Sequence, residues 1–249
     1  MHIGIIIGTG MDSITPAEQW SEVSTPYGSA HLTTATLDNT EVLLLRRHGP
    51  QLNIPPHLIN HRANVWALRH MGARSVIATA AVGTMRKDMR PGTLAVVSDF
   101  IDFTRQQVST FCDQPGEAVV HLDYSTPFCP KIASSLEQTA AEQGVSMGRR
   151  VVYVCVDGPR YETPAEVRMF TLWGGDVIGM TAAPEAILTR ELGMCYGVLA
   201  ILTNYAAGVS DKTLSHEEVV ACMNERRQDV IKILSSAVVK IPEKCTCCP

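Results

Sequence analysis

The chain has 249 residues, of which 45% are hydrophobic and 18% charged, and its formal net charge is −4. This composition is typical of a globular protein of one large or two small domains and excludes a disordered chain. The acidic balance, without a run of basic residues, argues against nucleic acid as a partner. Because we find no signal peptide and no apolar stretch long enough to span a bilayer, we expect a cytoplasmic protein with no membrane partner.

The first part of the chain places polar turns after predicted strands. The apolar run Ile3–Ile7 leads into Gly8-Thr9-Gly10, whose backbone amides and hydroxyl suit an anion, although the spacing is not that of a dinucleotide or Walker loop. Strands at 29–37 and 41–45 form a predicted hairpin. The second ends in Arg46-Arg47-His48, which either clamps an oxyanion or is a solvated strand end.

The middle of the chain alternates helices and strands before a long irregular segment. Its helices stop at glycines, and its buried strand runs into the glycine turn Val82-Gly83-Thr84. In order, we predict a helix at 57–70, strands at 75–81 and 93–97, an excursion without periodicity at 103–128, and a helix at 131–143.

The stretch 155–166 joins a predicted strand to a predicted helix and is a candidate ligand site. Gly158-Pro159 ends the strand, and Thr163-Pro164 has the pattern of a helix start. Tyr161 and Glu162 therefore lie on a strand-to-helix loop, where α/β proteins bind ligands. An aromatic ring beside a carboxylate suits a planar heterocycle with an N–H donor; an ordinary surface loop is the alternative.

The last third continues the alternation. A strand at 176–179 precedes Met180-Thr181, and Thr181 is a predicted N-cap, a position that favours anions. A buried strand at 195–203 ends at Asn204. The final helix begins after Ser215, and its predicted inward residues are Val220, Met223, Val230, Leu234 and Val238.

Polar residues thus gather at the carboxyl ends of several predicted strands. Such ends meet at one edge of an α/β sheet, so we expect a single site with an anion pocket beside an amide and a carboxylate. The arrangement fits a phosphate together with a planar second ligand. The residues concerned are Thr9, Arg47, His48, Glu162, Met180, Thr181 and Asn204.

Three of the eight cysteines, Cys245, Cys247 and Cys248, lie in the last five residues. A metal site needs more ligands than this short tract supplies, and no histidine is close in sequence, so we expect no metal and a redox-labile or inert tail. Cys155 and Cys195 lie within apolar strands, where cysteine commonly acts as a small hydrophobe.

With these motifs in order, the chain resembles the trimeric purine nucleoside phosphorylase and methylthioadenosine phosphorylase family. The resemblance rests on Gly8-Thr9-Gly10, Arg47-His48, the stretch 158–163, the stretch 179–185 and Thr203-Asn204. It implies one α/β domain at 1–240, a mixed sheet curled into a distorted barrel flanked by helices, with a cysteine-rich tail at 241–249. It also implies a homotrimer, or a dimer of trimers.

The resemblance assigns roles to individual positions. Inorganic phosphate would be a co-substrate, with no further cofactor, and Ala80 departs from a family pattern that often has a hydroxyl there. Met180 would contact the ribose, while His121 would reach a neighbouring subunit's site. The phosphate group is Thr9, Arg47, His48, Ala80, Ala81 and Thr181; the catalytic group is Asn204, His48 and Glu162; and the substrate group adds Tyr161, Met180, Ala206, His216, Val220 and His121.

The implied reaction is phosphorolysis of a purine nucleoside, and the pocket residues indicate the base. Glu162 can accept a hydrogen bond from N1–H of a 6-oxopurine, and the Asn204 amide can serve O6 and N7. His216 resembles a residue that binds a nucleoside 5′-hydroxyl. We therefore expect inosine or guanosine as substrate, with methylthioinosine or methylthioadenosine as the alternative. A non-catalytic purine nucleotide-binding protein and a redox protein built on the tail are weaker hypotheses.

Overall fold

The computed structural model describes residues 2–11, 14, 19–116, 119–242 and 245. Within these residues, nine strands form one mixed sheet in the order β2-β3-β4-β1-β5-β8-β7-β6-β9. The strands are β1 (Ile3–Ile7), β2 (Ser21–Thr25), β3 (Gly28–Leu37), β4 (Thr40–Arg46), β5 (Ser75–Thr84), β6 (Leu94–Asp102), β7 (Val151–Cys155), β8 (Val177–Gly179) and β9 (Cys195–Tyr205).

Half of this sheet closes on itself. Strand β9 pairs with β6 and also, in parallel, with β5, so that β5, β8, β7, β6 and β9 form a closed barrel. Strands β1 and β4 extend the sheet from β5 in parallel, and the antiparallel β3 and β2 complete it. The predicted fold, a single α/β domain with a sheet curled into a distorted barrel, is confirmed.

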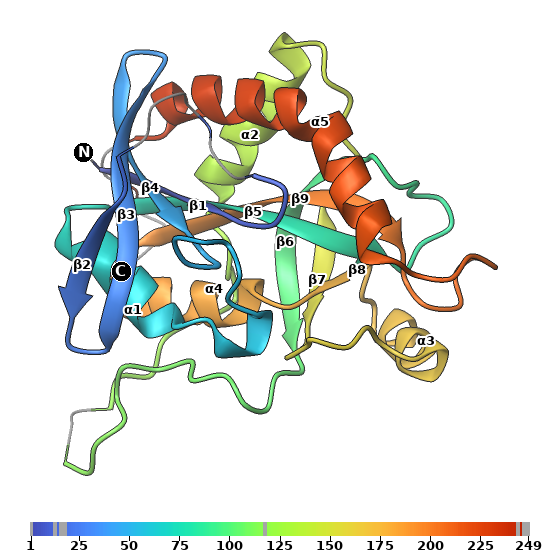
Figure 1. Ribbon diagram of the computed structural model, residues 1–249, viewed down its shortest axis with the longest axis horizontal. Coiled ribbons are helices and arrows are strands. Elements are labelled where there is room, and N and C mark those ends of the chain that lie inside the picture. Colours follow the sequence, from blue (N-terminus) through green and yellow to red (C-terminus); the bar gives the residue numbers. More distant parts are fainter. Residues whose placement is uncertain (1, 12–13, 15–18, 117–118, 243–244, 246–249) are drawn as a thin grey trace.

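Helices cover the sheet on both faces (Figure 1), where α2 and α5 lie above it and α1 and α4 below. Consecutive residues of β1 pack on opposite sides: Ile5 and Ile7 belong to the core shared with α2 and α5, and Ile6 to the core shared with α1 and α4. A strand buried on both faces needs no polar alternation, which is why β1 is apolar throughout. The helices are α1 (His61–His70), α2 (Pro130–Glu142), α3 (Pro164–Leu172), α4 (Ala182–Glu191) and α5 (His216–Ala237), with short 3₁₀ turns at Pro56–Leu58 and Val238–Lys240.

Several predicted boundaries are confirmed by local geometry. Asp38 and Asn39 have positive φ angles of 43° and 63°, as a tight hairpin turn requires. Thr163 caps α3 and forms a reciprocal capping box with Glu166. The segment predicted to be irregular, 103–128, contains no helix or strand among its described residues.

Other sequence predictions were wrong in detail. The helix expected from residue 57 begins at His61 after a 3₁₀ turn. Strand β5 continues through the expected glycine turn at 82–84 because Gly83 remains paired with β9. Val220 was expected to face the core but is exposed. Among the described residues, no helix is both long and apolar enough to cross a membrane.

Candidate active site

A cavity of about 570 Å³ opens at the carboxyl ends of β1, β4, β5, β8 and β9. The expected convergence of strand ends is therefore present in the structure. The cavity is large enough for a nucleoside-sized ligand, since small-molecule sites commonly measure ~300–1,000 Å³. Of the residues selected from sequence, its wall includes Thr9, Arg47, His48, Ala80, Ala81, Tyr161, Glu162, Met180, Thr181, Asn204, His216 and Val220.

Arg47, which follows the last residue of β4, is held by an acidic partner from α4. Its guanidinium binds Glu185 through both carboxylate oxygens, at 2.6 Å and 3.0 Å, and donates to the Thr79 carbonyl at 2.8 Å. Burial alone would lower the pKa of Arg47, but the charge and hydrogen bonds of Glu185 raise it above its ordinary value. Arg47 therefore presents a permanent, pre-oriented positive charge to the cavity.

The first glycine of the Gly8-Thr9-Gly10 turn makes room for that charge. A Cβ atom on Gly8 would lie 2.3 Å from Nη1 of Arg47, so a larger residue would displace the guanidinium. Gly10, with a φ of +75°, packs in the same way against Met223 of α5. The turn thus brings Thr9 between Arg47 and the last helix.

His48 is oriented by a backbone carbonyl. Its Nδ1 lies 2.8 Å from the Ile54 carbonyl oxygen, and because a carbonyl can only accept, Nδ1 carries the proton. Burial and the adjacent Arg47 charge lower the pKa of His48 below its ordinary value. A neutral ring with this tautomer has its lone pair on Nε2. His48 therefore offers a hydrogen-bond acceptor beside the Arg47 cation.

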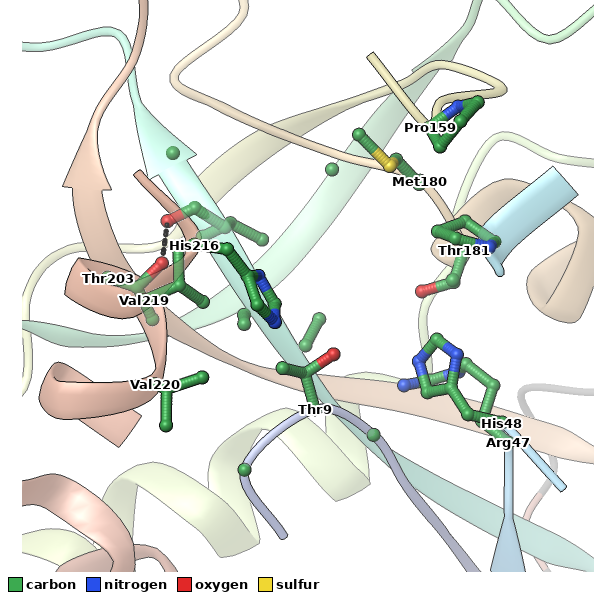
Figure 2. Close-up of a pocket in the computed structure, with 18 of the residues that line it drawn as sticks. Thr9, Arg47, His48, Pro159, Met180, Thr181, Thr203, His216, Val219 and Val220 are labelled. Atoms are coloured by element: carbon green, nitrogen blue, oxygen red, sulfur yellow. Dashed lines mark hydrogen bonds between the residues drawn. The ribbon is translucent and has the colours of Figure 1, made fainter. Parts of the chain in front are cut away.

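Thr181 is the N-cap residue of α4 and contacts Tyr153. The Thr181 amide donates to the Tyr153 hydroxyl at 3.3 Å, and the Thr181 side chain makes no capping bond to its own helix. A Cβ on Gly179 would meet the Tyr153 hydroxyl at 2.1 Å, so this glycine allows the tyrosine to reach the helix start. Figure 2 shows Thr181 beside Arg47 and His48 on one side of the cavity.

A register shift in the barrel turns Asn204 toward the cavity. Val82 pairs with Leu202 but Gly83 pairs with Asn204, so Thr203 is an extra residue on β9. The Thr203 hydroxyl donates to Oδ1 of Asn204 at 2.9 Å.

Asn204 Nδ2 donates to the Tyr205 carbonyl at 3.0 Å. A donor therefore contacts the amide oxygen and an acceptor contacts the amide nitrogen, and these two contacts fix the orientation of the amide. Each atom keeps one further hydrogen-bonding position for a ligand.

Glu162 lies on the strand-to-helix loop, lines the same cavity as Asn204 and is 8% exposed. Burial, and then the nearby charge of Glu166, raise the pKa of Glu162 above its ordinary value. On the same loop, Gly158 has a φ of +72°, and a Cβ there would lie 2.4 Å from the Met180 sulfur. The loop therefore packs closely over Met180, which also lines the cavity.

The start of α5 forms the far wall of the cavity. In Figure 2 the His216 ring projects toward Thr9, across the cavity from His48 and Thr181, with Val219 and Val220 one turn further along. His216 and Val220 are exposed, whereas Val219 is buried. The wall thus combines an imidazole with two branched apolar side chains.

Three residues selected from sequence are not brought into this cavity. His121 is exposed on the 103–128 segment and does not line the cavity within the described chain. Ala206 is buried in a small core with Phe170 and Ile178, behind the wall. Arg46 turns away, with its guanidinium 4.2 Å from the centre of the Trp20 ring. Arg47 is therefore the arginine of the 46–47 pair that faces the cavity.

Sequence reasoning missed several supporting residues. The role of Glu185 was not foreseen, nor were those of Tyr196, whose hydroxyl donates to Glu185 at 2.6 Å, and His61, whose Nδ1 lies 3.7 Å from the same carboxylate. Burial lowers the pKa of His61 to about 4, so its ring is neutral at neutral pH. The loop 52–56 also lines the cavity. The sequence signal that could have identified Glu185 was the motif at 179–185, which contains Pro184-Glu185.

Comparison with known proteins places this architecture in a family. The model of the phosphorylase superfamily matches residues 2–239. The chain belongs to the phosphorylase superfamily. It is 45% identical to the 6-oxopurine nucleoside phosphorylase of Pyrococcus furiosus, over 99% of this chain and 95% of that protein. It is 43% identical to a "probable S-methyl-5'-thioinosine phosphorylase" of Methanothermobacter thermautotrophicus, over 98% and 87%.

A solved structure of this superfamily has the same fold. Methylthioadenosine phosphorylase from Schistosoma mansoni, in complex with adenine, superposes with a TM-score of 0.90 at 29% sequence identity. The superposition covers 96% of this chain and 91% of the other. The family resemblance predicted from the sequence motifs is therefore confirmed.

Proposed function

We propose that this protein is a purine nucleoside phosphorylase that converts 6-oxopurine nucleosides and inorganic phosphate to free base and ribose 1-phosphate. The observation that carries the proposal is that one cavity joins the buried Arg47 charge to the Asn204 and Glu162 side chains. An anion pocket beside a purine-sized hydrogen-bonding wall is what this two-substrate reaction requires. The relatives named as 6-oxopurine nucleoside phosphorylases, which cover nearly the whole chain, support the same activity.

On the phosphate side, Arg47 supplies the fixed charge, and the hydroxyls of Thr9 and Thr181 supply neutral donors. The lone pair on Nε2 of His48 accepts the remaining proton of hydrogen phosphate. These groups hold phosphate against the anomeric carbon, which removes much of the entropic barrier to attack. A phosphate oxygen gives an electron pair to the anomeric carbon, and the electron pair of the broken glycosidic bond leaves with the base.

On the base side, the contacts of Asn204 determine which purine fits. Its Nδ2 has one N–H left for O6 of the base, and its Oδ1 has one lone pair left for an N7–H group. N7 carries no proton in the nucleoside; it gains one as the base departs, and in the balance of the reaction this is the proton that hydrogen phosphate gives up. Stabilising the departing purine at N7 and O6 lowers the barrier, and one preorganised contact of this kind is worth roughly 3–4 kcal/mol.

Glu162 accepts from N1–H of a 6-oxopurine. A 6-aminopurine has an N1 lone pair instead, which would face the carboxylate without a proton between them. Mispairing at a buried polar site can discriminate by ~10⁴–10⁵. Base selection therefore favours hypoxanthine and guanine over adenine.

The two leading candidate activities, phosphorolysis of inosine and of methylthioinosine, differ only in the 5′ substituent of the nucleoside. Methylthioinosine carries the same base as inosine, so Asn204 and Glu162 do not distinguish the two nucleosides. His216 favours a hydroxyl, whereas Val219 and Val220 are compatible with a thioether. We place inosine and guanosine first because an imidazole projects into this part of the cavity, with methylthioinosine as the second candidate.

The deciding experiment measures base release from inosine, guanosine, adenosine, methylthioinosine and methylthioadenosine, each with and without inorganic phosphate. We expect turnover of the 6-oxopurine nucleosides that depends strictly on phosphate. Equal turnover in its absence would identify a hydrolase. Nucleoside binding without any turnover would instead favour a non-catalytic purine-binding protein.

We further propose a cytoplasmic homotrimer that needs no cofactor. His121 directly follows Val119 and Val120, which are 68% and 71% exposed in the isolated chain. Adjacent exposed valines beside a histidine suit a surface that is covered by a neighbouring subunit. Light scattering of the purified enzyme gives the oligomeric state, and a monomer that is fully active would contradict this part of the proposal.

A further inference from the structure

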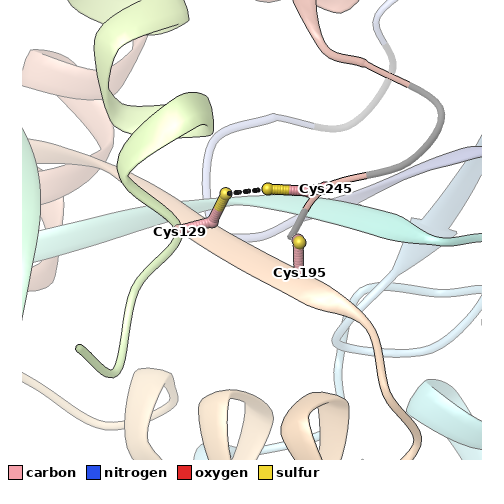
Figure 3. A group of neighbouring side chains, drawn as sticks. All are labelled: Cys129, Cys195 and Cys245. Atoms are coloured by element: carbon pink, nitrogen blue, oxygen red, sulfur yellow. Dashed lines mark hydrogen bonds between the residues drawn. The ribbon is translucent and has the colours of Figure 1, made fainter. Parts of the chain in front are cut away.

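Three cysteines from distant parts of the sequence meet at one point, well away from the candidate active site. They are Cys129, which precedes α2, Cys195, the first residue of β9, and Cys245 in the tail (Figure 3). Their sulfur atoms all lie within 4.8 Å of one another, and those of Cys129 and Cys245 are 3.7 Å apart. The sequence carries two further thiols, Cys247 and Cys248, directly after Cys245.

The backbone fixes two of these cysteines relative to each other. The Cys129 amide donates to the Tyr196 carbonyl at 2.8 Å, and the Cys195 amide donates to the Arg74 carbonyl at 2.9 Å. Tyr196 follows Cys195 in β9, so these bonds hold the two cysteines side by side. Both side chains are 3% exposed. Two thiols are thus preorganised in the protein, and the tail brings a third against them.

The spacing matches thiolates around a metal ion. A zinc–sulfur bond is about 2.3 Å long, so two sulfur ligands at the tetrahedral angle lie about 3.8 Å apart. The Cys129–Cys245 separation of 3.7 Å agrees with this value, and all separations are within 4.8 Å, so a shift of about 1 Å or less brings each of them to it. A disulfide would instead require sulfur atoms about 2.05 Å apart.

The electrostatic surroundings favour charge on at least one sulfur. Cys129 occupies the N-cap of α2, a helix of 13 residues, and its side chain makes no capping bond there. The partial positive charge of a helix N-terminus stabilises a thiolate. A divalent d¹⁰ cation would neutralise two of three thiolates, of which those of Cys129 and Cys195 are buried and that of Cys245 is partly exposed.

We propose that Cys129, Cys195 and Cys245 form a structural site for a thiophilic d¹⁰ cation of the zinc class. The ion ties the tail to the start of β9 and to the start of α2. Asn204 lies nine positions after Cys195 on the same strand, which at about 3.3 Å per residue is roughly 30 Å away. The site is therefore independent of the chemistry in the cavity, and its loss should affect stability without affecting turnover.

The test uses the full chain, purified in a non-thiol reductant and titrated with Zn²⁺, with Cd²⁺ as a spectroscopic probe of thiolate ligation. We expect about one zinc per chain to be retained against a chelator of micromolar affinity. The single variant Cys245→Ser and the double variant Cys129→Ser/Cys195→Ser should lose the ion and the cadmium–thiolate absorption. Cys112→Ser, which changes an exposed thiol outside the cluster, is the matched control and should retain both.

Thermal unfolding is the second measurement. A hundredfold excess of free zinc over its Kd should raise the Tm of the wild type by about 5–10 °C, and the rise should be absent in the variants. Their retained phosphorolysis shows that they are folded. A reduced wild type that binds no zinc, or cluster variants that bind it equally well, would overturn the proposal. So would an oxidised, metal-free protein in which a disulfide joins these cysteines and no reduced form takes up zinc.

Discussion

The Arg47 guanidinium and the Glu185 carboxylate, 138 residues apart in the sequence, form a bidentate ion pair in which both side chains are at most 2% exposed. The pair positions the fixed positive charge of the cavity. Removing either partner leaves an isolated buried charge, which typically costs about 3–5 kcal/mol. Because Arg47 is itself buried in this pair, its charge is best tested by a substitution at Glu185.

We predict that Glu185→Gln loses about 3–5 kcal/mol of unfolding free energy. Added phosphate should stabilise this variant more than the wild type, because the anion supplies the negative charge that Arg47 has lost. The measurement is Tm with and without phosphate. Glu137→Gln is the matched control: it breaks the exposed pair with Arg150, 2.7 Å apart, and should cost about 1 kcal/mol or less. Equal phosphate responses in both variants would remove Arg47 from the anion pocket.

Thr181→Val should raise the KM for phosphate by about 10- to 150-fold, because a hydrogen bond to a charged group is worth about 1.5–3 kcal/mol. The KM for inosine should change much less. Initial rates over a grid of both substrate concentrations separate the two constants. Thr36→Val, on the exposed side of β3, serves as the control. An unaltered phosphate KM in Thr181→Val would exclude this hydroxyl from phosphate binding.

Glu162→Gln should be more thermostable than the wild type at neutral pH and less active. Burial raises the pKa of Glu162 above its ordinary value of 4.5, so the folded protein favours the protonated carboxyl. That favourable contribution is complete below pH 4.5 and is lost as the pH rises through the folded-state pKa. Glutamine remains neutral throughout and therefore avoids the loss.

The measurement is Tm against pH for both proteins. The advantage of the glutamine variant should shrink to nothing below pH 4.5, the unperturbed value. The kcat/KM for inosine should fall by about 5- to 150-fold, the cost of weakening a buried contact to N1–H. A pH-independent difference in Tm would show that Glu162 is not desolvated in solution.

His216→Val should shift the preference from inosine toward methylthioinosine. A dry imidazole would produce a large preference, of roughly 5- to 150-fold, but His216 is exposed in the isolated chain. We therefore expect the smaller effect of one solvated hydrogen bond, about 2- to 12-fold. The ratio of kcat/KM for the two nucleosides in both proteins gives the answer. An unchanged ratio would place His216 outside the 5′ site and make methylthioinosine the preferred candidate.

Local chemistry in the sequence was enough to predict the alternation of strands and helices, their capping residues and the polar residues at the strand ends. The apolar run of β1, the Asp38-Asn39 turn and the Thr163 cap depend on neighbours a few residues away, so their conformations follow from local preferences. Because strand ends carry the polar residues, their convergence was also predictable.

Only the tertiary structure decided how those side chains are held and charged. The partner of Arg47 is 138 residues distant, and the bulge at Thr203 exists only where β9 meets β5. The neutral state of His48 depends on burial and on the Arg47 charge, neither of which sequence spacing reveals. Likewise, the tail by itself has too few ligands for a metal site. The two thiols that meet Cys245 in space, Cys129 and Cys195, lie more than 45 residues upstream, so sequence spacing does not connect them with it. Contacts between residues far apart in the chain are made by packing, and packing alone determined these features.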